Sequence, residues 1–213
     1  MTVLFIILGI LAFIILWQIF LRLIRRFVKF PAPAFMGGLL DSGLRKRMEP
    51  PARVIAGSGI KPGMQVLEIG CGPGTFTLDA ARAAAEKGKV YALDIQEDML
   101  KQLQRKLSLP ENYDIKNIEF LNNSAYELPL EDNSLDLVFM VTVFQEIPDK
   151  QRALSEFKRV LKPSAILAIS EWIVDPDYPW TSTTRRMAER GGFVYDGFSG
   201  NRWNYTVRFR KPC

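Results

Sequence analysis

The sequence predicts an α/β fold, a three-layer sandwich in which helices cover both faces of a mostly parallel sheet. Residues 66–69 form an apolar run, typical of a buried parallel strand, and a glycine-rich turn follows it. Helical segments and short apolar runs then alternate as far as residue 190. Residues 193–198 and 203–210 are two strands joined by a short turn, which predicts an antiparallel hairpin.

The turn after the first strand holds Gly70, Gly72 and Gly74. Glycine tolerates backbone angles that a Cβ forbids, and it lets a ligand lie against the main chain. In α/β sheets, small cofactors bind at the carboxyl ends of the strands. A dinucleotide-binding turn needs its third glycine one residue later, where this chain has Thr75, so the spacing argues against a dinucleotide. A glycine-rich turn without a ligand is the alternative.

Glu68 and the three glycines form the pattern E-x-G-x-G-x-G, which resembles motif I of the class I S-adenosylmethionine-dependent methyltransferases. The order and spacing of the elements between residues 50 and 210 resemble the same family. The resemblance implies a Rossmann-like, seven-stranded sheet in the order 3-2-1-4-5-7-6 with the last strand antiparallel. It also implies S-adenosylmethionine as the cofactor and a methyltransferase of the small-molecule or lipid type.

The elements after the turn continue this order. We expect a helix over residues 75–87 and a strand over 90–94 that ends in Asp94, about 20 residues beyond the glycines. Asp94 resembles the family's ribose-binding acid, although an aspartate there also suits the N-cap of a helix over residues 97–107. A third strand over 117–121 leads to a segment that resembles the adenine-contacting one, with Ser124 where the family has an aspartate.

For the second half of the fold we expect a strand over residues 135–141, an amphipathic helix over 151–161, a strand over 165–170 and a helix over 181–190. By the resemblance, the cofactor-binding residues lie at the ends of the first four strands. They are Glu68, Gly70, Cys71, Gly72, Gly74, Asp94, Ile95, Ser124, Ala125 and Val141.

Residues 3–21 contain no charge and are almost entirely apolar. Nineteen helical residues extend about 28 Å, close to the thickness of a bilayer core of about 30 Å. Arg22, Arg25, Arg26 and Lys29 follow at once, which predicts a single-pass membrane anchor with the catalytic domain in the cytoplasm. The charge order and the length of the run argue against a signal peptide, and a buried helix is the other alternative.

The chain therefore divides into an anchor with its basic flank (residues 1–29), a linker with helices that cap the sheet (30–64) and a methyltransferase domain (65–213). Residues 35–40 are either a structural cap on the sheet or a functional segment, which is a substrate lid or a lipid contact. No insertion is large enough for a separate substrate domain, so the acceptor is expected to contact a mostly aromatic and apolar lining. The candidates are Phe35, Met36, Phe144, Gln145, Trp172 and Tyr178.

The residue types limit the chemistry. The chain has no histidine, and neither its two cysteines nor its carboxylate spacing indicates a metal or a disulfide. Methyl transfer depends mainly on alignment of the acceptor with the methyl group, and a base is needed only if the acceptor must lose a proton. Glu146 is the candidate base, with Gln145, Glu171 and Tyr178 behind it, although an acid there also suits the start of the following helix.

These observations predict S-adenosylmethionine-dependent methyl transfer to a small or lipophilic acceptor at the cytoplasmic face of a membrane. A cofactor-binding scaffold without transferase activity is the alternative, favoured by Ser124, and a dinucleotide oxidoreductase is the third possibility. Beyond residue 29 the chain carries 24 basic and 23 acidic residues. This near balance leaves no excess of positive charge of the kind that binds nucleic acid. The expected partners are therefore a small or lipid-like substrate and the membrane.

Overall fold

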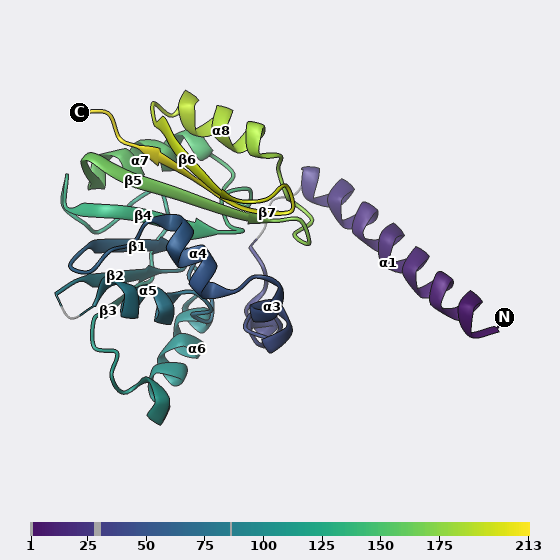
Figure 1. The fold of residues 1–213 in the computed structure, drawn as a ribbon. Coiled ribbons are helices and arrows are strands. Elements are labelled where there is room, and N and C mark those ends of the chain that lie inside the picture. Colours follow the sequence, from purple (N-terminus) through teal and green to yellow (C-terminus); the bar gives the residue numbers. More distant parts are fainter. Residues whose placement is uncertain (1, 28–30, 86) are drawn as a thin grey trace.

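One seven-stranded sheet organises the chain, with the strand order β3-β2-β1-β4-β5-β7-β6 (Figure 1). The computed structural model describes residues 2–27, 31–85 and 87–213. All neighbouring strands are parallel except β7, which runs antiparallel to both β5 and β6. The strands are β1 (Gln65–Ile69), β2 (Lys89–Leu93), β3 (Ile118–Leu121), β4 (Leu135–Val141), β5 (Leu161–Trp172), β6 (Val194–Gly200) and β7 (Asn204–Arg210). The predicted sheet order and the antiparallel last strand are confirmed.

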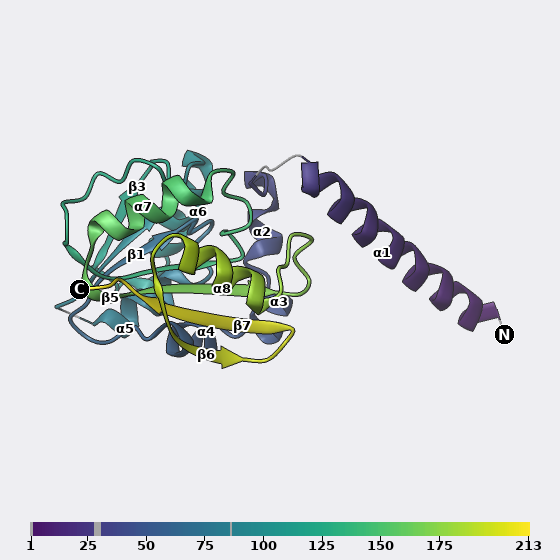
Figure 2. The same ribbon diagram turned by 90° about the horizontal axis from the view of Figure 1, so that it is seen from above.

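Helices cover both faces of this sheet and precede it. They are α1 (Thr2–Phe27), α2 (Gly37–Leu40), α3 (Gly43–Met48), α4 (Pro51–Ser58), α5 (Thr77–Ala84), α6 (Glu97–Leu107), α7 (Lys150–Val160) and α8 (Thr181–Arg190), with 3-10 turns η1 (Ala34–Met36) and η2 (Pro110–Asn112). Figure 2 shows α4 and α5 below the sheet and α7 and α8 above it. This is the predicted three-layer arrangement.

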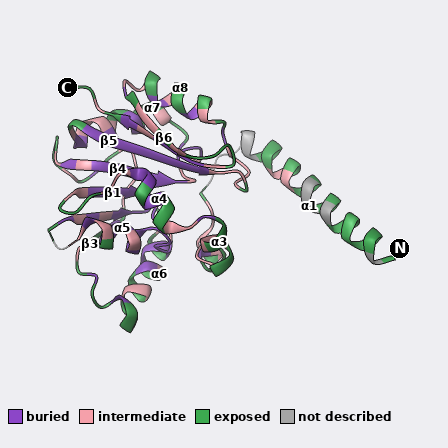
Figure 3. Ribbon diagram, in the orientation of Figure 1, coloured by how far each residue is buried: buried purple, intermediate pink, exposed green. Residues whose placement is uncertain are grey.

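The side chains of each strand alternate between two cores. Val66 of β1 packs with α4, α5 and α6, whereas its neighbour Leu67 packs with α7 and α8. Both residues are fully buried, because a parallel sheet between two helical layers has no solvent face (Figure 3). The turns at the carboxyl ends of β1, β2, β4 and β5 are therefore held by a rigid, fully packed frame.

Two expected elements differ in extent. The helix expected over residues 75–87 covers only Thr77–Ala84, and Ala85, at φ +56° and ψ −169°, has backbone angles that favour glycine. Gly88 is required for another reason, because a Cβ there would lie 2.5 Å from the carbonyl oxygen of Ala84. Strand β5 begins four residues earlier than expected, since Leu161 already pairs with Leu135.

The predicted membrane span over residues 3–21 lies within α1. The described large apolar side chains of this helix are exposed, as Figure 3 shows. Among the residues that the structure describes, however, no helix meets the length and hydropathy that a membrane crossing requires. The transmembrane helix is therefore not confirmed and stays a prediction. Within the basic flank, Lys29 lies outside the described residues.

Candidate functional site

The glycine turn leaves β1 with three successive glycines in the left-handed region, Gly70 at φ +67°, Gly72 at +53° and Gly74 at +79°. A Cβ on Gly70 would lie 2.6 Å from Val143, and one on Gly74 would lie 2.2 Å from Leu103. A Cβ on Gly72 would meet nothing within 4 Å. Two of these glycines therefore serve packing, while Gly72 alone faces open space against which a ligand can lie.

Asp94 connects this turn to the end of β2. Its Oδ2 accepts a hydrogen bond from the Gly72 backbone N–H at 2.9 Å, and its Oδ1 accepts one from Gln96 N–H at 2.9 Å. Gln96, not Asp94, is the N-cap of α6. Each carboxylate oxygen keeps a second lone-pair site for another donor. The open space at Gly72 and the spare acceptor capacity of Asp94 fit the ribose diol of S-adenosylmethionine.

Asp94→Asn is expected to weaken binding of S-adenosylmethionine by about 10- to 100-fold, because an amide nitrogen cannot accept the N–H that holds the turn and a charged hydrogen bond contributes about 1.5–3 kcal/mol. Calorimetric titration measures the affinity. Asp98→Asn, an exposed aspartate in the first turn of α6, is the matched control and should bind normally. Equal affinity in the two variants would contradict the role of Asp94.

The other predicted cofactor residues lie around the same turn. Ile95 is exposed beside Asp94, whereas Val141 is buried at the end of β4. Ser124 and Ala125 are half-buried after β3, and the Ser124 hydroxyl accepts the Tyr126 backbone N–H at 3.3 Å. Cys71 is buried, and burial raises the pKa of its thiol well above the usual value, so it stays a neutral filler rather than a nucleophile. The roles of these residues remain predictions.

Glu68 is buried in β1, and its Oε2 has no hydrogen-bond partner among the described residues. Burial is the largest cause that raises the pKa of its carboxyl to about 8, and the nearby Asp94 charge adds to the shift, while Thr77 opposes it. Burial therefore favours the protonated, neutral form of Glu68. A neutral carboxyl can donate a hydrogen bond, so this end of the site can also bind a hydrogen-bond acceptor.

Glu68→Gln is expected to make stability less dependent on pH. The folded-state pKa of Glu68 exceeds its unfolded value of about 4.5, so the folded state retains a proton that the unfolded state releases, and stability falls as pH rises from about 4.5 to 8. The variant should unfold at higher urea than the wild type at pH 8, by a free energy on the order of a few kcal/mol, and match it at pH 4. Identical pH profiles would contradict this assignment.

Residues 31–49 cover the carboxyl edge of the sheet and touch three of its loops. Gln96 Nε2 donates to the Ala32 carbonyl at 2.8 Å, and Thr75 Oγ1 donates to the Leu40 carbonyl at 3.1 Å. Arg45 Nη2 donates to Thr142 Oγ1 at 3.2 Å. Because these partners directly adjoin Ile95, Gly74 and Val141, the segment borders the predicted cofactor residues on all three strands.

Arg45 and Glu49 were not identified as site residues from the sequence. The guanidinium of Arg45 lies 5.6 Å from the ring centre of Phe76 and 5.9 Å from that of Trp172, and its Nε is 3.5 Å from Oε2 of the fully buried Glu49. Burial raises the pKa of Glu49 to about 7, although Arg45 opposes the shift. Only tertiary packing brings Arg45 and Glu49 to the site, since both residues are remote in sequence from every motif.

Buried polar atoms without hydrogen-bond partners among the described residues gather beyond β4 and β5. They are Oε1 of Glu171, Nε2 of Gln145 and Oε1 of Glu49, whose other carboxylate oxygen pairs with Arg45. Burial raises the pKa of Glu171 well above its usual value, and the charges of Asp175, Glu49 and Glu146 add to the shift. Buried polar groups are normally paired, so this group of orphans is typical of a site that a polar ligand completes.

The predicted acceptor-lining residues take different positions around this group. Trp172 and Met36 are half-buried, Phe35 is exposed, and Phe144 is fully buried in the core. Tyr178 is half-buried and its hydroxyl donates to the Arg202 carbonyl. Glu146 is half-buried in the turn after β4, and its charge is felt by Glu171. No observation tests whether these residues contact an acceptor.

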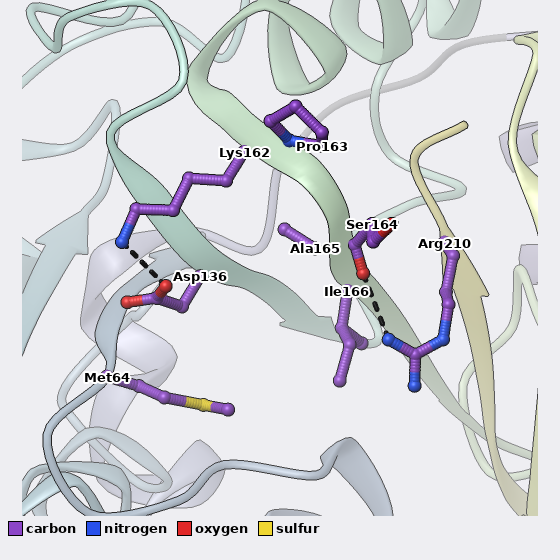
Figure 4. A pocket seen from close by; sticks show the side chains of 8 residues that line it. All are labelled: Met64, Asp136, Lys162, Pro163, Ser164, Ala165, Ile166 and Arg210. Atoms are coloured by element: carbon purple, nitrogen blue, oxygen red, sulfur yellow. Dashed lines mark hydrogen bonds and ion pairs between the residues drawn. The ribbon is translucent and has the colours of Figure 1, made fainter. Parts of the chain in front are cut away.

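A cavity of about 230 Å³ lies at the opposite edge of the sheet (Figure 4). Its charged groups are already engaged, because Lys162 Nζ lies 2.6 Å from Asp136 and Arg210 Nη1 donates to the Ser164 carbonyl at 2.9 Å. This cavity adjoins the start of β4, away from the glycine turn, and we do not assign the chemistry to it. In the described part of the chain, no group of three or more acidic, cysteine or histidine side chains has the arrangement of a metal site.

Comparison with known proteins agrees with this geometry. The profile of the family "Methyltransferase domain" matches residues 60–203. A solved S-adenosylmethionine-dependent methyltransferase from Aquifex aeolicus is 29% identical with a TM-score of 0.77, and the match covers 85% of this chain and 100% of that one. A putative methyltransferase from Methanococcus maripaludis, 17% identical with a TM-score of 0.69 over 87% of this chain and 96% of that one, shares the fold.

Curated relatives match a shorter segment. A demethylmenaquinone methyltransferase of Bacillus mycoides is 38% identical over 104 residues, which cover 49% of this chain and 43% of the relative. The enzyme of the same name from Bacillus cereus matches to the same extent. The chain thus spans less than half the length of these relatives. On the family profile, which matches more than half of the chain, the chain belongs to the methyltransferase domain family, and together with the solved neighbour this confirms the predicted class of enzyme and S-adenosylmethionine as its cofactor.

Proposed function

We propose that this protein transfers a methyl group from S-adenosylmethionine to a small lipophilic acceptor of the quinone type. The observation that carries the proposal is the buried carboxyl of Glu171, whose Oε1 has no partner among the described residues. It lies at the end of β5, where Arg45 and Trp172 bring aromatic and polar groups together. An apolar ring with one or two oxygens matches such a lining, and the name of the Bacillus relatives, demethylmenaquinone methyltransferase, supports that class of acceptor.

The chemistry requires one proton to leave the acceptor. The sulfonium of the cofactor supplies the methyl group, and the sulfur leaves as a neutral thioether. The reduced, quinol form of such an acceptor supplies the electron pair for the new bond to the methyl carbon. Its ring C–H or O–H loses a proton in this step, and an ionised carboxylate can take that proton. Burial raises the pKa of the Glu171 carboxyl well above its usual value, so we take Glu171 as the candidate base, and Glu146 remains the alternative base.

We also propose that α1 holds the enzyme at a membrane, with the catalytic domain in the cytoplasm. Its described apolar side chains are exposed along the whole helix, and water solvates such a surface poorly. The basic residues that follow the apolar run favour the cytoplasmic side. After expression in bacteria, the full chain should sediment with membranes and resist alkaline carbonate extraction. Recovery in the soluble fraction would contradict the anchor without affecting the catalytic proposal.

Methyl-labelled S-adenosylmethionine tests the reaction when it is incubated with the full chain in detergent and either demethylmenaquinone that has been chemically reduced to its quinol or a total lipid extract kept under the same reductant. We expect label in the quinone fraction, and none with a Gly72→Arg variant. Label in another lipid or in water-soluble material would overturn the quinone acceptor. Tight cofactor binding without any labelled product would instead favour the scaffold alternative, in which the fold is kept without transfer.

A further inference from the structure

An apolar rim surrounds the carboxyl edge of the catalytic domain. It consists of Phe35, Leu39, Leu44, Met48, Trp180 and Trp203, all between 50% and 87% exposed. These residues come from η1, α2, α3, the start of α8 and the β6–β7 turn. Figures 1 and 2 both place these elements on the side of the sheet from which α1 departs. Segments distant in sequence thus contribute apolar side chains to a single edge.

The end of α1 contacts the loop that leads to this rim. Arg22 Nη2 at the end of that helix donates to the Ile173 carbonyl at 3.1 Å, in the loop that leads from β5 to Trp180. The exposed apolar surface of α1 and the rim therefore lie on the same side of the catalytic domain. Exposed apolar surfaces of this extent mark interaction sites.

The charges around the rim favour an anionic partner. Arg47 and Arg202 are exposed, and the guanidinium of Arg202 lies 5.2 Å from the ring centre of Trp203. Among the nearby acids, Glu49 is fully buried and Asp41 bridges Lys46 at 2.9 Å and Lys106 at 2.7 Å. Tryptophan and arginine together are typical of side chains at a membrane interface.

We infer that this rim docks the catalytic domain onto the surface of an anionic phospholipid bilayer. Trp180 and Trp203 insert at the level of the headgroups, and Arg47 and Arg202 contact lipid phosphates. The site beyond β5 then opens directly against the bilayer, and a lipophilic acceptor can enter without crossing water. That last consequence rests on the proposed function, whereas the docking itself is measured without turnover.

The test uses the full chain with Trp17→Phe and Trp172→Phe, so that only Trp180 and Trp203 fluoresce. The protein is reconstituted in phosphatidylcholine–phosphatidylglycerol vesicles whose acyl chains carry bromine near the headgroup. We expect at least a twofold loss of fluorescence relative to vesicles without bromine. Unquenched emission from chains that float with the vesicles would overturn the docking and leave the α1 anchor intact, whereas failure to float would overturn both.

Paired variants in the same reporter locate the contact. Leu44→Glu with Arg47→Glu should reduce the quenching at least twofold, because a negative charge then faces the anionic surface. Val194→Glu with Lys87→Glu is the matched control, since both residues are exposed and lie at the opposite edge of the sheet. Equal quenching in the two pairs would overturn the assignment of the rim. If bromine does not quench the emission and cross-linking detects a dimer, a second copy of the chain covers the rim. This result would also overturn the docking onto the bilayer.

Discussion

Gly72→Arg is expected to abolish detectable binding of S-adenosylmethionine, a loss of at least 100-fold in affinity, while the protein stays folded. A Cβ at this position meets no protein atom within 4 Å, so the side chain starts out into the space assigned to the cofactor. The φ of +53° makes any substitution there strained by about 1–2 kcal/mol. Calorimetric titration measures the affinity, and thermal unfolding measures the cost of the strain.

Gly63→Arg is the matched control. Gly63 also has a positive φ, +88°, and a Cβ there also meets nothing within 4 Å, but it lies in the turn before β1, at the other end of that strand. Both variants should lose similar stability, and only Gly72→Arg should lose the cofactor. Gly70→Ala and Gly74→Ala are unsuitable for this purpose, because their Cβ atoms collide with Val143 and Leu103 and the fold itself must adjust. If Gly72→Arg binds S-adenosylmethionine normally, the assignment of the cofactor to this turn is wrong.

The sheet order and the glycine turn were predictable because their signals are local. The run ending at Glu68, the spacing of the three glycines and the aspartate after the next strand each lie within a few residues, and the packed parallel sheet leaves little choice in how they meet. The limits of α5 were less predictable. The turn extends to Phe76 before the helix starts, and Ala85 ends it in a conformation that favours glycine.

The way in which residues 31–49 cover the site was not predictable, because polar contacts between residues far apart in the sequence determine it. Nothing in the sequence around Glu49 indicates a carboxyl that becomes fully buried beside Arg45. Thr142, the hydroxyl that receives Arg45, sits at φ +55° immediately after β4, and strain of this kind in a non-glycine residue is typical of functional sites. The alternatives for residues 35–40, a structural cap, a substrate lid or a lipid contact, all remain compatible with these contacts.

Glu171→Gln is expected to lower kcat by about 100-fold and to leave the affinity for S-adenosylmethionine within twofold of the wild type, because general-base catalysis contributes about 10²- to 10⁴-fold. The carboxyl acts as a base only when ionised. Burial and the charges of Asp175, Glu49 and Glu146 raise its pKa, so kcat should increase with pH through a range above that of ordinary carboxyls. The glutamine variant should show no such increase, which distinguishes lost proton transfer from lost packing.

Glu146→Gln separates the two candidate bases, since Glu146 contributes to the raised pKa of Glu171. If Glu171 is the base, removal of that repulsion lowers its pKa and moves the pH–kcat profile to lower pH, with the plateau within a few fold of the wild type. If Glu146 is the base, the plateau itself collapses and the profile of Glu171→Gln keeps its inflection. Steady-state kinetics with demethylmenaquinone across pH 5 to 9 distinguish these outcomes. Only substitution of the true base should both lower the plateau value of kcat and remove the inflection from the pH–kcat profile.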